Sequence, residues 1–107
     1  MRVGDIANQK HPSIYEDELV TKARALIRNF SLRILPVVNA EKRLAGVVSR
    51  NSVMAISSSV SPIKVKGIMT QPKHIATLKD DAYQTVREMI RLDEWCIPVV
   101  ETRTEKF

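Results

Sequence analysis

The sequence is poor in the residue types that build metal and redox sites. It has one cysteine, Cys96, and two histidines, His11 and His74, which lie far apart in the chain. No cysteine–histidine cluster with zinc-type spacing is present, and neither histidine stands beside a serine or cysteine that it could activate. Cys96 lies in an apolar segment, so we expect a buried thiol in a reducing, cytoplasmic compartment.

Glycine and long apolar runs are also scarce. With three glycines, the chain contains neither a P-loop nor a G-x-G-x-x-G turn. The acidic runs 16–18 and 80–81 precede periodic apolar segments, so they indicate helix starts rather than catalytic carboxylates. We therefore expect no catalysis. The sequence also lacks a run of about 18 apolar residues and an apolar N-terminal signal, so we expect no membrane segment.

The chain carries a moderate excess of positive charge. The chain has 17 basic and 12 acidic residues, a formal net charge of +5, and 5% aromatic residues. A positive charge fits an anionic partner such as a nucleotide phosphate, although a solvated basic surface explains it equally well. The basic residues are dispersed and aromatic residues are few, which argues against nucleic-acid binding.

A duplicated motif is the main feature that the sequence does contain. Pro36-Val37-Val38 and Pro98-Val99-Val100 are 62 residues apart, and the same shift places Val3 on Val65 and Ile6 on Ile68. One unit is therefore used twice. A serine-rich linker at 57–62 divides the chain into units 1–62 and 63–107, which together form one domain.

The first unit is predicted to contain three strands and two helices. We expect strands at 13–15, 33–39 and 44–49, the last two joined as a hairpin, and a second helix at 49–56. The first helix buries one apolar stripe: Val20, Ala23, Ile27 and Phe30. Because proline cannot donate to a ladder, Pro36 should start the paired part of its strand or lie at an edge, and Gly46 should mark a bulge or a close approach.

The second unit repeats this pattern over most of its length. We expect strands at 74–78 and 95–100, and between them a helix with its apolar face formed by Ala82, Val86, Met89 and Ile90. Residues 101–107 align with the hairpin turn and the start of the following strand. The second unit is therefore either truncated or continued beyond Phe107.

These motifs resemble the CBS domain, a module named after cystathionine β-synthase that usually occurs in tandem pairs. The matching residues are the openings Val3-x-x-Ile6 and Val65-x-x-Ile68-Met69-Thr70, the two Pro-Val-Val runs, and Leu44-x-Gly46-Val47-Val48-Ser49. The resemblance covers nearly the whole chain and about two thirds of the second motif. It implies an α+β fold in which tandem β-α-β-β-α motifs pack through their sheets with pseudo-two-fold symmetry.

The resemblance also implies a ligand site in clefts between the motifs. The ligands would be AMP, ATP or S-adenosylmethionine, bound without being transformed. Ser49 would meet ribose or phosphate, and the family's ribose-binding aspartate is replaced here by Ser52. The other residues expected at the ligand are Leu35, Pro36, Arg50, Thr70, Lys73, Ile97 and Pro98.

Each of these residues also has a purely structural interpretation. Ser49 would serve as a helix cap, the apolar residues as core, and Thr70 and Lys73 as a solvated loop. Trp95 fits either the interface between motifs or a cleft wall.

We therefore predict a regulatory, ligand-sensing module that acts as a homodimer. The alternative is an interaction module that dimerises without a small ligand, and Ser52 in place of aspartate motivates it.

Overall fold

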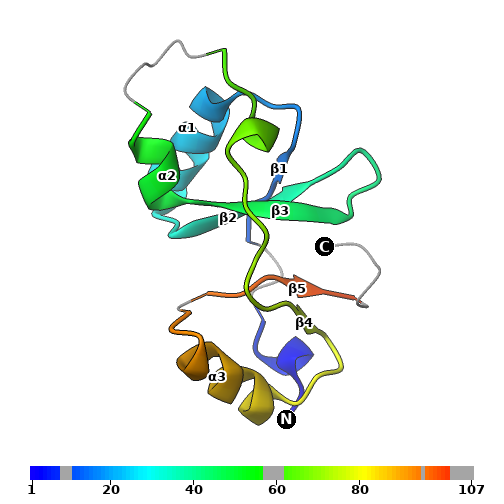
Figure 1. The fold of residues 1–107 in the computed structure, drawn as a ribbon. Helices are drawn as coiled ribbons and strands as arrows, with labels where there is room; N and C mark the ends of the chain where they lie inside the picture. The colour runs from blue at the N-terminus through cyan, green and yellow to red at the C-terminus, as the bar shows by residue number, and fades with distance from the viewer. Residues whose placement is uncertain (8–10, 57–61, 95, 102–107) are drawn as a thin grey trace.

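The computed structural model describes residues 1–7, 11–56, 62–94 and 96–101, and arranges them as two lobes, each with a small sheet and helices on its outer side (Figure 1). The first lobe contains β1 (Ile14–Tyr15), α1 (Val20–Phe30), β2 (Ile34–Val38), β3 (Leu44–Ser49) and α2 (Arg50–Met54). The second contains β4 (Ala76–Thr77), α3 (Ala82–Arg91) and β5 (Val99–Val100). The mixed helix and strand content confirms the predicted α+β class.

The two sheets repeat the same pairing. In the first, β2 lies in the centre, parallel to β1 and antiparallel to β3. In the second, β4 is parallel to β5 as β1 is to β2. The 62-residue repeat seen in the sequence is therefore a repeat of topology, although β5 is shorter than the predicted strand 95–100. Trp95 and the linker residues 57–61 lie outside the described part of the chain.

The core of the first lobe lies between its helices and its sheet. Val20, Ala23 and Ile27 of α1 are at most 2% exposed, as the predicted stripe requires, and each such aliphatic side chain contributes about 1.5–3 kcal/mol on burial. Phe30 was expected in the same stripe but is 59% exposed. It is the last residue of α1, and the chain turns away directly after it at Ser31, which has the left-handed φ of 54°.

Pro36 lies inside β2, opposite Val47 of β3. Val47 makes its backbone hydrogen bonds to Thr70 on its other side, at 2.8 and 2.9 Å, so the Pro36–Val47 pair exchanges none. On the β1 side, pairing begins only at Val37. The prediction that Pro36 starts the paired part of its strand is therefore correct for the pairing with β1 and wrong for the pairing with β3. The N–H group that proline lacks leaves no acceptor on β3 without a partner.

The segments that open the two motifs each pack on the opposite lobe. The 3-10 turn η1 (Val3–Asp5) hydrogen-bonds to the second lobe, where Val3 N–H donates to Asp80 O and Gly4 N–H to Leu78 O. The 3-10 turn η2 (Val65–Gly67) hydrogen-bonds to the first, where Val65 N–H donates to Glu18 O at 2.8 Å. This reciprocal exchange ties the two lobes together.

The apolar face predicted for α3 is only half correct. Ala82 is buried and Met89 is half-buried, but Val86 is 44% and Ile90 75% exposed. Thr85, a polar residue, takes an inner position instead and is 7% exposed, with its hydroxyl donating to Asp81 O at 2.9 Å. The buried face of α3 is therefore turned away from Val86 and Ile90.

Candidate ligand pocket between the motifs

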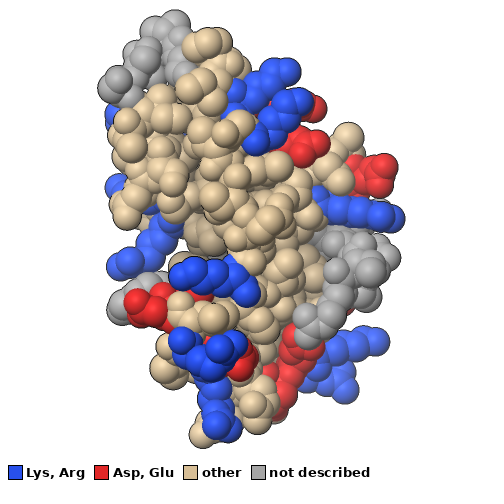
Figure 2. All heavy atoms as spheres, in the orientation of Figure 1, with Lys and Arg blue, Asp and Glu red and all other residues tan. Residues whose placement is uncertain are grey.

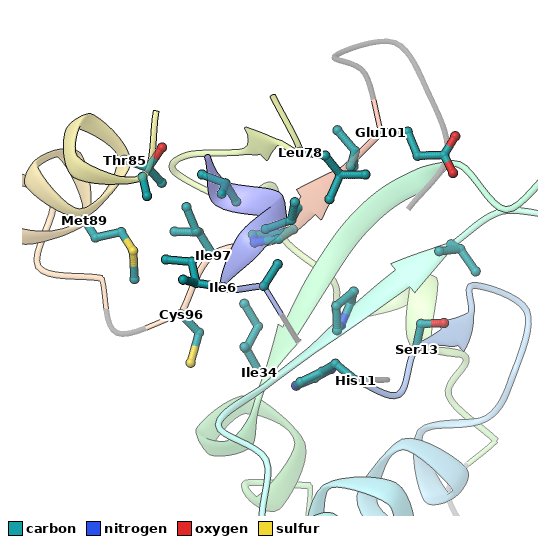
Figure 3. Close-up of a pocket in the computed structure, with 18 of the residues that line it drawn as sticks. Ile6, His11, Ser13, Ile34, Leu78, Thr85, Met89, Cys96, Ile97 and Glu101 are labelled. Carbon is teal, nitrogen blue, oxygen red and sulfur yellow. The ribbon is translucent and has the colours of Figure 1, made fainter. Parts of the chain in front are cut away.

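A cavity of about 710 Å³ lies between the two lobes (Figure 3). The first lobe contributes Ile34, Pro36 and Val38 of β2 to its wall, and the second contributes β5, the residues just before it, and one side of α3. The volume lies within the range of about 300–1,000 Å³ that is usual for small-molecule sites. Because both motifs line the cavity, a ligand that fills it contacts both.

The wall is mainly apolar, with few polar groups. The polar or charged lining residues are His11, Ser13, Tyr15, Lys42, Thr85, Cys96 and Glu101. His11 Nδ1 lies 2.8 Å from Pro12 O, which can only accept, so Nδ1 carries the proton and a neutral ring presents Nε2 as an acceptor. Cys96 is half-buried at this wall rather than fully buried as expected.

The hairpin between β2 and β3 holds Lys42, the only lysine or arginine among the described lining residues. Asn39 Oδ1 accepts from the N–H groups of Glu41 and Arg43, and Lys42 N–H donates to Asn39 O at 2.9 Å. Lys42 itself has a left-handed φ of 63°. The turn is thus fixed by its own hydrogen bonds, which sets where the lysine side chain starts.

Three of the residues predicted at the ligand line this cavity: Pro36, Ile97 and Pro98. Leu35, their neighbour in the sequence, is 0% exposed and belongs to the hydrophobic core. Successive strand residues point to opposite faces of the sheet, so Pro36 and Leu35 cannot both face the same cleft.

Ser49, Arg50 and Ser52 lie outside the cavity wall, at the start of α2. Ser49 Oγ accepts from Ser52 N–H at 3.1 Å and donates to Ser52 Oγ at 3.0 Å, so it is a helix cap. Arg50 N–H donates to Arg33 O, and its guanidinium lies 3.4 Å from Leu32 O. Both serines are exposed.

Thr70 and Lys73 also lie outside the cavity, in the loop that crosses from η2 to β4. Thr70 pairs through its backbone with Val47 of the first lobe, and a Cβ on Gly46 would stand 2.9 Å from Thr70 O. The close approach expected at Gly46 is therefore confirmed. Lys73 Nζ is 3.6 Å from Glu94 Oε1 in an ion pair whose lysine is 64% exposed.

The sequence analysis missed the N-terminal side of the cavity. His11, Ser13 and Tyr15 come from the loop and strand that follow η1. Ile6 lines the same cavity and lies beside Ile97 (Figure 3). Ile6 belongs to the repeated V-x-x-I motif, so the sequence marks it as part of the repeat. Its place in the cavity wall depends on the exchange of the opening segments between the lobes.

On one face of the molecule, surface charge does not indicate a second site. On the face shown in Figure 2, lysine and arginine form separate groups with acidic residues between several of them. In the part of the chain that the structure describes, no three His, Cys, Asp or Glu side chains group as metal ligands would. No helix among the described residues has the length and apolarity needed to cross a membrane.

Comparison with known proteins supports this fold. The CBS domain profile matches residues 3–59. Homoserine O-acetyltransferase of Methanococcus vannielii is 28% identical over 102 residues, which are 92% of this chain and 21% of the relative. The chain thus spans about a fifth of that enzyme's length.

Three solved structures have the same fold. The CBS domains of a transcriptional regulator from Streptococcus pneumoniae superpose with a TM-score of 0.87 at 18% identity, covering 100% of this chain and 89% of that one. The CBS domain pair of protein MJ0100, in complex with 5′-methylthioadenosine and S-adenosyl-L-methionine, gives 0.81 at 16% identity over 99% and 84%. The CBS domain of a bacterial CNNM/CorC family Mg²⁺ transporter in complex with ATP gives 0.78 at 18% over 94% and 73%.

The two-lobed repeat of topology and the profile match over more than half of the residues lead to one conclusion: this chain belongs to the CBS domain family and forms a CBS pair.

Proposed function

We propose that the chain is a regulatory module that binds an adenosine-containing ligand in the cavity between its motifs and does not transform it. The observation that carries this proposal is the cavity of about 710 Å³, which is lined by both motifs. Pro36, Ile97 and Pro98 supply flat apolar walls suited to a purine. Similar CBS structures hold adenosyl ligands, which supports the ligand class.

The charges at the cavity favour ligands with little phosphate. Lys42 is the one lysine or arginine among the described lining residues, and Glu101 lies on the same wall. A triphosphate needs several cationic or N–H partners, whereas a nucleoside with a sulfonium or a single phosphate needs fewer. We therefore propose S-adenosylmethionine or AMP ahead of ATP.

The regulatory step would be a shift between arrangements of the two lobes. A ligand that contacts both lobes favours whichever arrangement gives it the better contacts. The exchanged segments η1 and η2 cross between the lobes. They therefore supply the connection through which a change at the cavity would reach a neighbouring domain or subunit.

Isothermal titration with S-adenosylmethionine, AMP and ATP tests the proposal. We expect measurable heat with at least one of them, and its loss in Ile97→Asp, which places a carboxylate in the apolar wall. Ser49→Ala, outside the wall, is the matched control and should bind as the wild type does. Absence of both heat and thermal shift with all three ligands would refute the ligand-sensing role.

The second candidate is an interaction module that has no small ligand. Ser52 favours it, because its hydroxyl is engaged with Ser49 and offers no carboxylate to a ribose. This candidate predicts a dimer whose sedimentation is the same with and without nucleotides.

A further inference from the structure

The imidazole of His11 is half-buried in the first-lobe wall of the cavity. Its Nδ1 lies 2.8 Å from Pro12 O, an oxygen that can only accept, so Nδ1 carries the proton of the neutral ring. The other ring nitrogen, Nε2, is then an acceptor. Among the residues that the structure describes, none donates a hydrogen bond to Nε2. A ligand in the cavity can therefore supply the missing donor.

The pairing of β1 with β2 places His11 beside the apolar part of the wall. The two strands are parallel, and their first paired residues are Ile14 and Val37. Carried back three residues along both strands, this register brings His11 level with Ile34. Pro36 lies two residues farther along β2, on the same face of the sheet as Ile34. All three line the cavity, so a flat base that packs against Pro36 has His11 nearby.

The other polar groups of the wall restrict a base less than His11 does. Hydroxyl groups can donate or accept, and the ammonium group of Lys42 can only donate. The carboxylate of Glu101 can only accept, but this residue is exposed, follows β5 and is well separated from His11 in Figure 3. Water remains available to an exposed carboxylate, so it discriminates weakly between ligands. His11 Nε2 is therefore the half-buried acceptor of the wall.

The repeat shows that this acceptor belongs to the first motif. The 62-residue shift places His11 on Lys73, whose ammonium group can only donate. Lys73 lies outside the cavity, where its Nζ is 3.6 Å from Glu94 Oε1. The two motifs therefore differ at this position both in hydrogen-bonding character and in relation to the cavity.

We propose that His11 determines which purine the cavity accepts: Nε2 accepts a hydrogen bond from the exocyclic 6-amino group of a base that packs on the apolar wall. This inference rests on the proposed function, because it concerns the ligand of the same cavity. A 6-amino group can only donate. The 6-oxo group of hypoxanthine or guanine can only accept, so it would face Nε2 with no proton between the two atoms. The cavity then selects 6-aminopurines over 6-oxopurines.

The hydrogen bond to Pro12 is what makes this selection possible. A histidine with a free choice of tautomer could move its proton to Nε2 and donate to a 6-oxo group. In His11 this change would remove the hydrogen bond from Nδ1 and leave Pro12 O against an unprotonated nitrogen. The tautomer that a 6-oxopurine needs is therefore disfavoured.

Titration of the full chain with three nucleoside 5′-monophosphates tests the selection. AMP has an amino group at purine C6, purine riboside 5′-monophosphate has hydrogen there, and IMP has an oxo group, while ribose and phosphate are the same in all three. We expect AMP to bind about tenfold more tightly than the analogue without the amino group, and IMP to bind most weakly. Equal wild-type affinities for AMP and either of the other two would overturn the proposal.

Two substitutions of His11 test the role of its acceptor. His11→Phe keeps a planar ring without the acceptor, so it should lower the affinity for AMP and S-adenosylmethionine about tenfold and barely change that for the analogue without the amino group. His11→Gln carries an amide that can turn to accept or to donate. It should bind AMP better than His11→Phe does and should bind IMP better than the wild type does. His74→Phe is the matched control, because His74 is also half-buried but lies outside the cavity.

The outcomes distinguish this inference from the proposed function. If neither AMP nor S-adenosylmethionine binds the wild type, both fail. If either binds His11→Phe as tightly as the wild type, the cavity remains the ligand site and the selection by His11 is wrong. Tighter binding of IMP to His11→Gln is a change that a purely structural role of His11 would not produce, and its absence would also contradict the proposal.

Discussion

At the scale of single residues, the two serines at the start of α2 show how a helix cap can stand where a ligand residue is expected. Ser49 Oγ accepts a hydrogen bond from Ser52 N–H and donates one to Ser52 Oγ. The cap accounts for both hydroxyls without a ligand. Its presence does not exclude a ribose, because both side chains are exposed.

Replacing Ser52 by aspartate, the residue expected there from the family, tests whether the start of α2 binds ribose. Because Ser52 lies outside the cavity wall, Ser52→Asp should leave adenosine binding in the cavity unchanged. A gain of about 1.5–3 kcal/mol, from a carboxylate that accepts from both ribose hydroxyls, would instead place the ribose at the start of α2. At such a site ATP would gain less than adenosine, because its phosphates repel the new charge. Titrations with both compounds, and Ser49→Ala as the companion variant, give the answer. No change in any of them would agree with binding in the cavity between the lobes.

The Glu88–Arg91 pair makes a pH-dependent contribution to the stability of the folded state. Hydrogen bonding from the Arg91 guanidinium lowers the pKa of Glu88 below its ordinary value of 4.5. Near pH 4.5 the folded state therefore binds fewer protons than the unfolded state. The stabilisation from the pair is fully present above this pH and is lost as the pH falls through the lowered pKa of Glu88. Glu88→Gln should lower the midpoint of thermal unfolding slightly at pH 7 and not at pH 3. An equal difference at both values would show that charge is not involved.

At the scale of elements, the two Pro-Val-Val strands are equivalent in sequence but not in burial. Val37 is 0% exposed and belongs to the core of the first lobe, on the central strand β2. Val99 of β5 is half-buried and borders the cavity. The same mutation should therefore lower the free energy of unfolding more in β2 than in β5.

Val37→Asp should abolish cooperative folding. An unpaired buried carboxylate costs several kcal/mol, a large share of the roughly 5–15 kcal/mol that stabilises a domain. Val99→Asp should leave a folded, less stable protein, because its carboxylate can reach water in the cavity. Urea unfolding followed by circular dichroism compares the two. A cooperatively folded Val37→Asp would show that the strand is not buried.

At the scale of the whole molecule, contacts between motifs hold the lobes in register. The opening segments η1 and η2 are exchanged, and Val47 pairs with Thr70 across the junction. Gly46 makes room for that pairing, since a side chain there would meet the Thr70 carbonyl. Its φ is not positive, so space rather than backbone conformation is what requires glycine.

Gly46→Ala should destabilise the protein by about 1–3 kcal/mol, the usual cost of overpacking. The added Cβ would lie 2.9 Å from a backbone oxygen that cannot move without breaking the Val47–Thr70 bridge. Gly67→Ala is the matched control, because its Cβ would meet only Ile63 Cγ2 at an ordinary 3.6 Å. Thermal unfolding of both variants should separate them, and equal midpoints would contradict a tight junction.

Local patterns were enough to predict much of this protein. The strands of the hairpin and the buried stripe Val20, Ala23 and Ile27 follow from periodicity within one element. The 62-residue repeat follows from the recurrence of the short motifs themselves. Such patterns are local, because the side chains of one helix or strand take their directions from the backbone that carries them.

Only the tertiary structure decided which neighbour each face has. The periodicity of α3 includes Val86 and Ile90, yet both are exposed, because burial depends on what packs beside the helix and not on the helix alone. Likewise, Leu35 enters the core while Pro36 lines the cavity, and residues near the N-terminus reach the second lobe. The sequence by itself determined the order of the elements and most of the inner face of α1. The long-range exchange between lobes determined the cavity.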